Sequence, residues 1–128
     1  RADFDPVDIP ELLANLVFFE VVEGGRDFRF RVIGENVRSV FFENYRGRTL
    51  GSLGHVQADG PLMRNFRQAV ESGAPVRAPV GYVGPERDLI KHDEIVLPLA
   101  DADGDVSHLL VFVVLASRQE PAMPPRFV

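Results

Sequence analysis

The chain has 128 residues, of which 45% are hydrophobic and 26% charged, with a formal net charge of -5. This length suits one domain with a single core, and the acidic balance disfavours a nucleic-acid partner. The absence of cysteine excludes disulfides, a thiolate nucleophile and a cysteine-linked chromophore. The longest apolar run, Leu109 to Ala116, is too short for a membrane helix, and with no export signal we expect a cytoplasmic protein.

Residues 1–15 are expected to form an N-terminal segment with a short leading helix. Asp8 and Glu11 have the spacing of a capping box, in which side chains bond to backbone N–H groups of the first turn. Apolar residues then recur at helical spacing: Ile9, Leu12, Leu13 and Leu16. The same segment is rich in acidic residues: Asp3, Asp5, Asp8 and Glu11.

Two strands, Leu16–Glu23 and Phe28–Ile33, are expected to pair as a hairpin around a turn that contains two glycines. Side chains of a strand alternate between its two faces. Unbroken alternation in the second strand divides it into Phe28, Phe30 and Val32 on one face and Arg29, Arg31 and Ile33 on the other.

Two helices are expected next. Val37, Val40 and Phe41 have the spacing of a short helix that packs on a core. A longer helix is predicted within Ala58–Val76, with Asp59 as N-cap, Pro61 in the first turn and Gly73 at its end. Its predicted buried face consists of Leu62, Phe66, Ala69 and Val70.

The remaining elements are expected to be strands at Val76–Val83, Asp93–Ala100 and His108–Ala116, followed by a Pro-rich tail at 118–128. Pro79 cannot donate a backbone hydrogen bond, which favours a sheet edge for its strand. The last strand is apolar at nearly every position, so both of its faces need cover and it belongs in the middle of the sheet.

Two strands, then helices, then three strands predict an α+β protein with one antiparallel sheet and helices on one face. From residue 16 to residue 117 this order resembles a PAS domain. The segment "FRFRVIG" is similar to a branch of small bacterial PAS proteins without an assigned ligand, and "PLADADGD" resembles the closing hairpin of the family. The resemblance implies a five-stranded sheet in the order 2-1-5-4-3 and a sensory role.

The resemblance also implies a ligand cavity between the concave face of the sheet and the helices. The side chains expected to line it are Phe28, Phe30, Val32, Val37, Val40, Phe41, Leu50, Leu53, Phe66, Val70 and Tyr82. Such a cavity suits a small, mostly apolar ligand, with Tyr82 as its polar contact.

Arginines gather around the second strand, where Arg29 and Arg31 share a face. Guanidinium groups bind carboxylates and phosphates well, so an anion site is one hypothesis. The resemblance places both arginines on the outer face, where the acidic N-terminal segment can pair with them. Structural pairing is the favoured interpretation, because arginines on strands usually serve as solvated or paired cover.

Other candidate sites are weak. The three histidines lack the spacing of a metal site, and His55 is the one candidate for a haem ligand. His92 and Glu94 form a possible proton-transfer pair, although the polar start of a strand is the simpler interpretation. Residues 101–105 lack the EF-hand spacing and are expected to form a turn. We therefore expect no catalytic residues, metal or cofactor and a colourless protein, although non-covalent flavin stays open.

The favoured function is a sensory or regulatory module that binds a small apolar ligand or a protein partner. One alternative is an enzyme with a cone-shaped isomerase or dehydratase fold, which needs a buried Asp, Glu or His; every candidate acid is expected in a turn, a cap or a strand start. Another is an interaction module without a ligand. The doubly apolar first and last strands further predict a homodimer through the outer sheet face, with Phe112 and Val114 in the interface.

Overall fold

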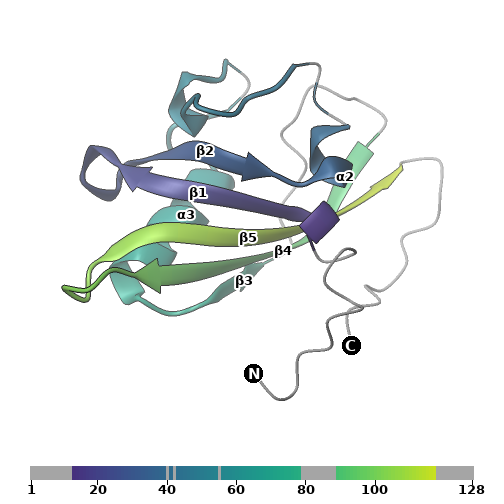
Figure 1. The fold of residues 1–128 in the computed structure, drawn as a ribbon. Coiled ribbons are helices and arrows are strands. Elements are labelled where there is room, and N and C mark those ends of the chain that lie inside the picture. The colour runs from purple at the N-terminus through teal and green to yellow at the C-terminus, as the bar shows by residue number, and fades with distance from the viewer. Residues whose placement is uncertain (1–12, 40, 42, 55, 79–88, 118–128) are drawn as a thin grey trace.

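The computed structural model describes residues 13–39, 41, 43–54, 56–78 and 89–117, without the side chains of 78, 89–93 and 114–117. Figure 1 shows one antiparallel sheet with its long helix packed behind it. The strands are β1 Leu16–Val22, β2 Asp27–Ile33, β3 Val76–Ala78, β4 Leu89–Ala100 and β5 Val106–Ser117. The helices are α2 Glu35–Arg38 and α3 Pro61–Ser72, with 3₁₀ turns η2 Glu23–Gly25 and η3 Leu50–Ser52.

The strand order is β2-β1-β5-β4-β3, which confirms the predicted order 2-1-5-4-3. β5 lies in the centre between β1 and β4, as its apolar composition requires. The turn between β4 and β5 is closed by Asp101, whose Oδ1 accepts bonds from the backbone N–H groups of Asp103 at 2.9 Å and Asp105 at 3.1 Å. Residues 101–105 are therefore a hairpin turn, as expected from their Asp and Gly content.

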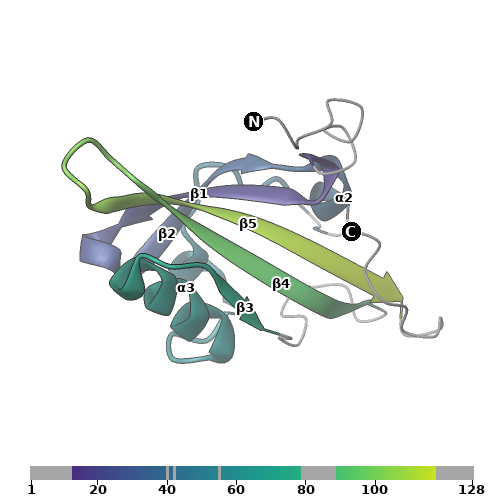
Figure 2. The same cartoon turned by 90° about the horizontal axis from the view of Figure 1, so that it is seen from below.

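One row of β-branched side chains crosses all five strands on the inner face. Each pair in the row is in direct cross-strand register: Ile33 with Val17, Val17 with Val111, Val111 with Val96, and Val96 with Val76. α3 lies on this side of the sheet (Figure 2) and contributes Leu62, Met63, Phe66 and Ala69 to the core. The core therefore lies between the inner face of the sheet and α3.

A β-bulge interrupts the alternation of β2. Phe19 pairs with Phe30 while the adjacent Phe18 pairs with Val32, so Arg31 is an extra residue on β2. As a result Ile33 packs against the core, whereas Val32 turns to the outer face and is 52% exposed. The prediction that Val32 shares a face with Phe30 is wrong, because it assumed unbroken alternation.

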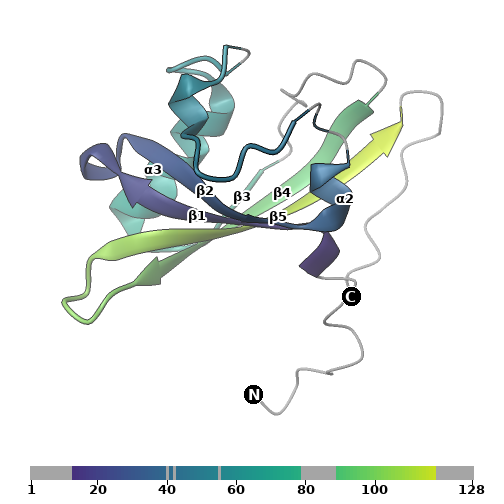
Figure 3. The same cartoon turned by 45° about the horizontal axis from the view of Figure 1, so that its top comes forward.

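The free edge of β2 is covered by the chain that follows α2, above the sheet in Figure 3. The N–H of Phe30 donates to the Arg48 carbonyl at 2.9 Å, and the N–H of Gly47 donates to the Phe30 carbonyl at 2.8 Å. Arg46 adds a bond from Nε to the Arg31 carbonyl at 3.1 Å. These bonds occupy backbone groups that would otherwise be open to another strand.

The helix boundaries differ from the sequence expectations. α3 begins at Pro61, so its N-cap is Gly60 and not Asp59, which instead lies 3.6 Å from Arg67. α2 ends at Arg38 and does not extend to Phe41. The expected leading helix falls mostly on residues 1–12, outside the described residues, although Leu13 and Ala14 are helical.

The predicted strand Val76–Val83 is described only as far as Ala78, where it forms the sheet edge as β3; Pro79 and the tail at 118–128 are outside the described residues. Among the described helices, none has both the length and the apolar character needed to cross a bilayer.

Replacing Gly34 by alanine is expected to lower the free energy of unfolding by about 2–3 kcal/mol. A Cβ there would meet backbone atoms of Leu13 and Ala14, with the Ala14 carbonyl oxygen only 2.6 Å away, and backbone yields less readily than a side chain. Gly54→Ala is the matched control, because nothing lies within 4 Å of its Cβ. Urea unfolding of both variants checks this, and equal stabilities would contradict the close packing at Gly34.

Candidate functional site

An aromatic cluster fills the space between the sheet and α3. Phe66 of α3 makes edge contacts with Phe19 at 5.1 Å and Phe28 at 5.2 Å between ring centroids. The contacts continue along the inner face, where Phe30 lies 4.7 Å from Phe19 and 5.8 Å from Tyr45. These rings cover much of the inner surface that the predicted ligand cavity would use.

The structure brings most of the predicted lining residues to one face. Six of them are buried in the shared core: Phe28, Phe30, Val37, Leu50, Leu53 and Phe66. Phe41 and Val70 are partly buried against that core. Val32 lies on the opposite face of the sheet, while Val40 and Tyr82 are outside the described residues. Their role in binding a ligand stays a prediction.

Sequence reasoning missed two aromatic members of this site. Phe19 could have been identified from the sequence, because alternation in β1 places it on the same face as Val17. Tyr45 follows α2 in an irregular segment without periodicity, yet it is buried and its ring lies 4.7 Å from Phe41. The guanidinium of Arg48 lies over that ring, 5.6 Å from its centroid, which is a cation–π contact within the segment between α2 and η3.

Glu94 is the other residue that sequence reasoning misjudged. β4 begins at Leu89, so Glu94 lies inside the strand and not at its start. It pairs with Val113 of β5 and faces the core, and only 3% of the residue is exposed. Among the described residues it is the one buried charged residue, so the expectation that every candidate acid lies in a turn, a cap or a strand start is wrong for Glu94.

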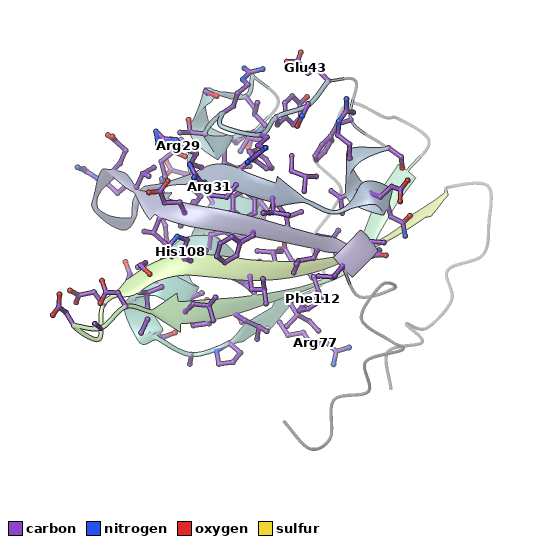
Figure 4. All side chains as sticks on the ribbon, in the orientation of Figure 1. Arg29, Arg31, Glu43, Arg77, His108 and Phe112 are labelled. Carbon is purple, nitrogen blue, oxygen red and sulfur yellow. The ribbon has the colours of Figure 1, made fainter. Side chains whose placement is uncertain are left out.

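The arginines of β2 lie on the side of the sheet away from α3 (Figure 4). Arg31 forms an ion pair with Glu20 of β1, with 3.8 Å between Nη1 and Oε1, and both side chains are well exposed. Glu20 is also the cross-strand neighbour of Arg29. An ion pair within the sheet therefore provides the partner of Arg31. The acidic side chains within residues 3–11, which the sequence predicts as partners of these arginines, are outside the described residues.

The outer face also carries an apolar surface. It consists of half-buried Phe18, Ile95, Leu97, Leu110 and Phe112 together with exposed Val32 and Leu99. Phe18, Leu110 and Leu97 form one cross-strand row, so these side chains are contiguous across three strands. At its hairpin end, the ring of His108 stacks on Phe18 with centroids 5.0 Å apart.

No group of three or more histidine, aspartate or glutamate side chains with the arrangement of a metal site occurs within the described part of the chain. The proposed haem ligand His55 is not described, and neither is the side chain of His92, so the pairing of His92 with Glu94 is untested.

Comparison with known proteins identifies relatives of this architecture. Residues 1–114 match the profile of a family described as PAS domain. A sensory box sensor histidine kinase from Vibrio cholerae has a similar solved structure, with a TM-score of 0.62 and 16% sequence identity over 87% of this chain and 90% of that one. At this identity the likeness concerns the fold alone. No curated protein matches the sequence.

Phe66→Ala is expected to lower the free energy of unfolding by about 3–5 kcal/mol, because the ring is buried among Phe19 and Phe28. Val32→Ala is the control from the outer face of the sheet and should change the free energy of unfolding by less than about 1 kcal/mol. Chemical denaturation of both variants measures the difference. A large loss in the Val32 variant would show that its side chain is packed in the folded protein.

Proposed function

The chain belongs to the PAS domain family, and on this basis we propose that it is a cytoplasmic sensory or regulatory module that binds a small molecule between its sheet and α3. The observation that carries the proposal is the inner face of the sheet, which bears a cluster of buried aromatic rings and, among the described residues, one buried carboxylate, that of Glu94. An apolar site with few polar groups is the usual form of a small-molecule pocket.

The composition of this face supports a defined ligand class. Phe28, Phe30 and Phe66 offer apolar contact area, which favours a ligand with a compact apolar body. Glu94 adds a buried carboxylate on the same face of the sheet, two residues from Val96, which favours a hydrogen-bond donor or a positive group on that ligand. Tyr82, the polar contact expected from the sequence, is proposed as a second polar group that bonds to the ligand.

The ligand proposal predicts a thermal shift. A ligand present at 100 times its dissociation constant stabilises the folded state by about 2.7 kcal/mol, which raises Tm by several degrees. We expect this from one or more fractions of a small-metabolite library, and native mass spectrometry of the protein as isolated should show the corresponding added mass. A protein that is isolated unliganded and that no fraction stabilises would instead be an interaction module without a ligand.

Glu94 also supports a second candidate, an enzyme that uses this carboxylate as general acid or base. A buried acid beside an apolar site is the arrangement that such isomerases and dehydratases need. Glu94→Gln separates the two functions, because it keeps a hydrogen-bonding side chain of the same size but cannot exchange a proton. A sensor is expected to show no turnover of any bound compound in either form. Turnover by the unmodified protein that disappears in the Glu94→Gln variant would establish the enzyme.

We further propose that the module dimerises through its outer sheet face. The row Phe18, Leu110 and Leu97 gives this face a contiguous, half-buried apolar centre, beside which Val32 and Leu99 are exposed. Large apolar patches on a protein surface usually mark an interaction site. Lateral pairing is less favourable on the β2 side, where Gly47 and Arg48 already bond to the strand. A two-fold partner that presents the same face would cover the surface of both copies.

Phe112→Lys is expected to convert the dimer to a monomer, since it places a charge in the buried centre of the proposed interface. Gln68→Lys is the matched control, because Gln68 is exposed on α3, on the opposite side of the sheet. Sedimentation velocity at high micromolar concentration distinguishes the two. A stable monomer of the unmodified chain at this concentration would contradict the proposal and would indicate that the N-terminal segment, not a second copy, covers the outer sheet face.

A further inference from the structure

Asn15 joins three elements at the end of the sheet where β1 begins. Its Oδ1 accepts a hydrogen bond of 2.9 Å from Nδ2 of Asn36, which lies on α2. Its Nδ2 donates a hydrogen bond of 2.8 Å to the backbone carbonyl of Val113, which lies in β5. One carboxamide thus holds a helix with its acceptor and a strand with its donor, which uses both ends of the asparagine amide.

The backbone of Asn15 strengthens the same junction. The N–H of Val113 donates to the Asn15 carbonyl at 3.0 Å, so both polar backbone groups of Val113 are bonded to this one residue. Asn15 precedes the first residue of β1, and its carboxamide extends the pairing with β5 beyond the regular strand. Removing that carboxamide would leave the Val113 carbonyl without this donor.

α2 is also held to the same segment by packing. Gly34, the N-cap of α2, donates its N–H to the Leu16 carbonyl at 2.6 Å. A Cβ at Gly34 would lie within 2.6 Å of the Ala14 carbonyl oxygen, so two stretches of backbone are in direct contact. A displacement of α2 must therefore move residues 13–16 or break these contacts.

The row through Val113 continues into the candidate site. Val113 pairs with Glu94 of β4, and Glu94 pairs with Ala78 of β3. Asn15, Val113 and Glu94 are thus successive neighbours along one line across the sheet, from the residue that holds α2 to the buried carboxylate. Val113 and Glu94 of this line are buried on the inner face of the sheet, and Val37 of α2 lies in the same core as Val113.

We propose that Asn15 is a positioning residue that couples α2 to β5, so that a change in one element shifts the other. Its consequence for signalling rests on the proposed sensory function: a ligand that displaces α2 or Glu94 would alter two neighbouring segments at one end of the sheet, namely residues 13–15 before β1 and β5 toward Ser117. The coupling itself is a property of the protein without ligand.

Amide hydrogen exchange of the full chain, read by NMR, tests the coupling. Asn36→Ala removes the link from α2 without touching β5, and we expect the Val113 amide to exchange about three- to tenfold faster. Asn15→Ala should accelerate exchange at Val113 and also at Arg38 and Ser39 at the end of α2. In the variant that carries both Asn15→Ala and Asn36→Ala, the Val113 amide should exchange no faster than in Asn15→Ala alone, because the two changes break one connected network.

Two further variants separate this role from general loosening. Ser39→Ala is the control, since it removes the bond of 2.8 Å from Ser39 Oγ to the Asn36 carbonyl within this helical segment and should leave Val113 unchanged. Asn15→Asp keeps the acceptor for Asn36 but lacks the donor for Val113, so it should accelerate amide exchange at Val113 and leave exchange at Arg38 and Ser39 unchanged. The same variant replaces Asn15→Ala in the test if Asn15→Ala fails to fold. The proposal would be overturned if the Val113 amide of the Asn36→Ala variant exchanged at the wild-type rate. It would also be overturned if Ser39→Ala accelerated exchange at Val113 as much as Asn36→Ala does. No ligand is needed, so this result and a failed ligand screen are distinguishable.

Discussion

The inner row of Ile33, Val17, Val111, Val96 and Val76 is the interaction on which the rest of the structure depends. It takes one β-branched side chain from each strand, and neighbouring members are in direct register. Such cross-strand pairs are the main unit of sheet stabilisation, and register slips by one residue would move every side chain to the other face. The row therefore sets which side chains meet α3 and which remain on the outer surface.

The bulge in β2 reconciles this row with the aromatic cluster. Phe30 and Ile33 are three residues apart, so unbroken alternation cannot place both on the inner face. With Arg31 as the extra residue, Phe30 packs on Phe19 while Ile33 still pairs with Val17. The same irregularity turns Val32 outward, where it enlarges the apolar outer surface.

The two faces of the sheet consequently have separate chemistry. The inner face combines buried aromatic rings with the carboxylate of Glu94, whereas the outer face combines apolar side chains with exposed pairs such as Arg31 and Glu20. β5 contributes to both, since Val111 and Val113 point inward and Leu110 and Phe112 pair with outer-face residues. A change in β5 thus reaches the candidate ligand site and the proposed partner surface together.

The resemblance to PAS domains supplied the order of the strands within the sheet, whereas the residues themselves determined the number of strands, their order along the chain, the long helix and the central place of β5. These follow from local signals, namely residue periodicity, turn residues and a strand that is apolar on both faces. Most residues of the inner face, such as Phe28, Phe30 and Phe66, were predictable in the same way.

Only the tertiary structure decided the position of Val32, the burial of Glu94 and Tyr45, and the hydrogen bonds of Asn15. Each depends on a partner distant in the chain: β1 sets the bulge, β5 lies beside Glu94, the ring of Phe30 lies against Tyr45, and Val113 and Asn36 both bond to Asn15. Periodicity describes which residues of one element share a face, but it contains no information on which element packs against them. The residues that connect elements are therefore the ones that the sequence could not identify.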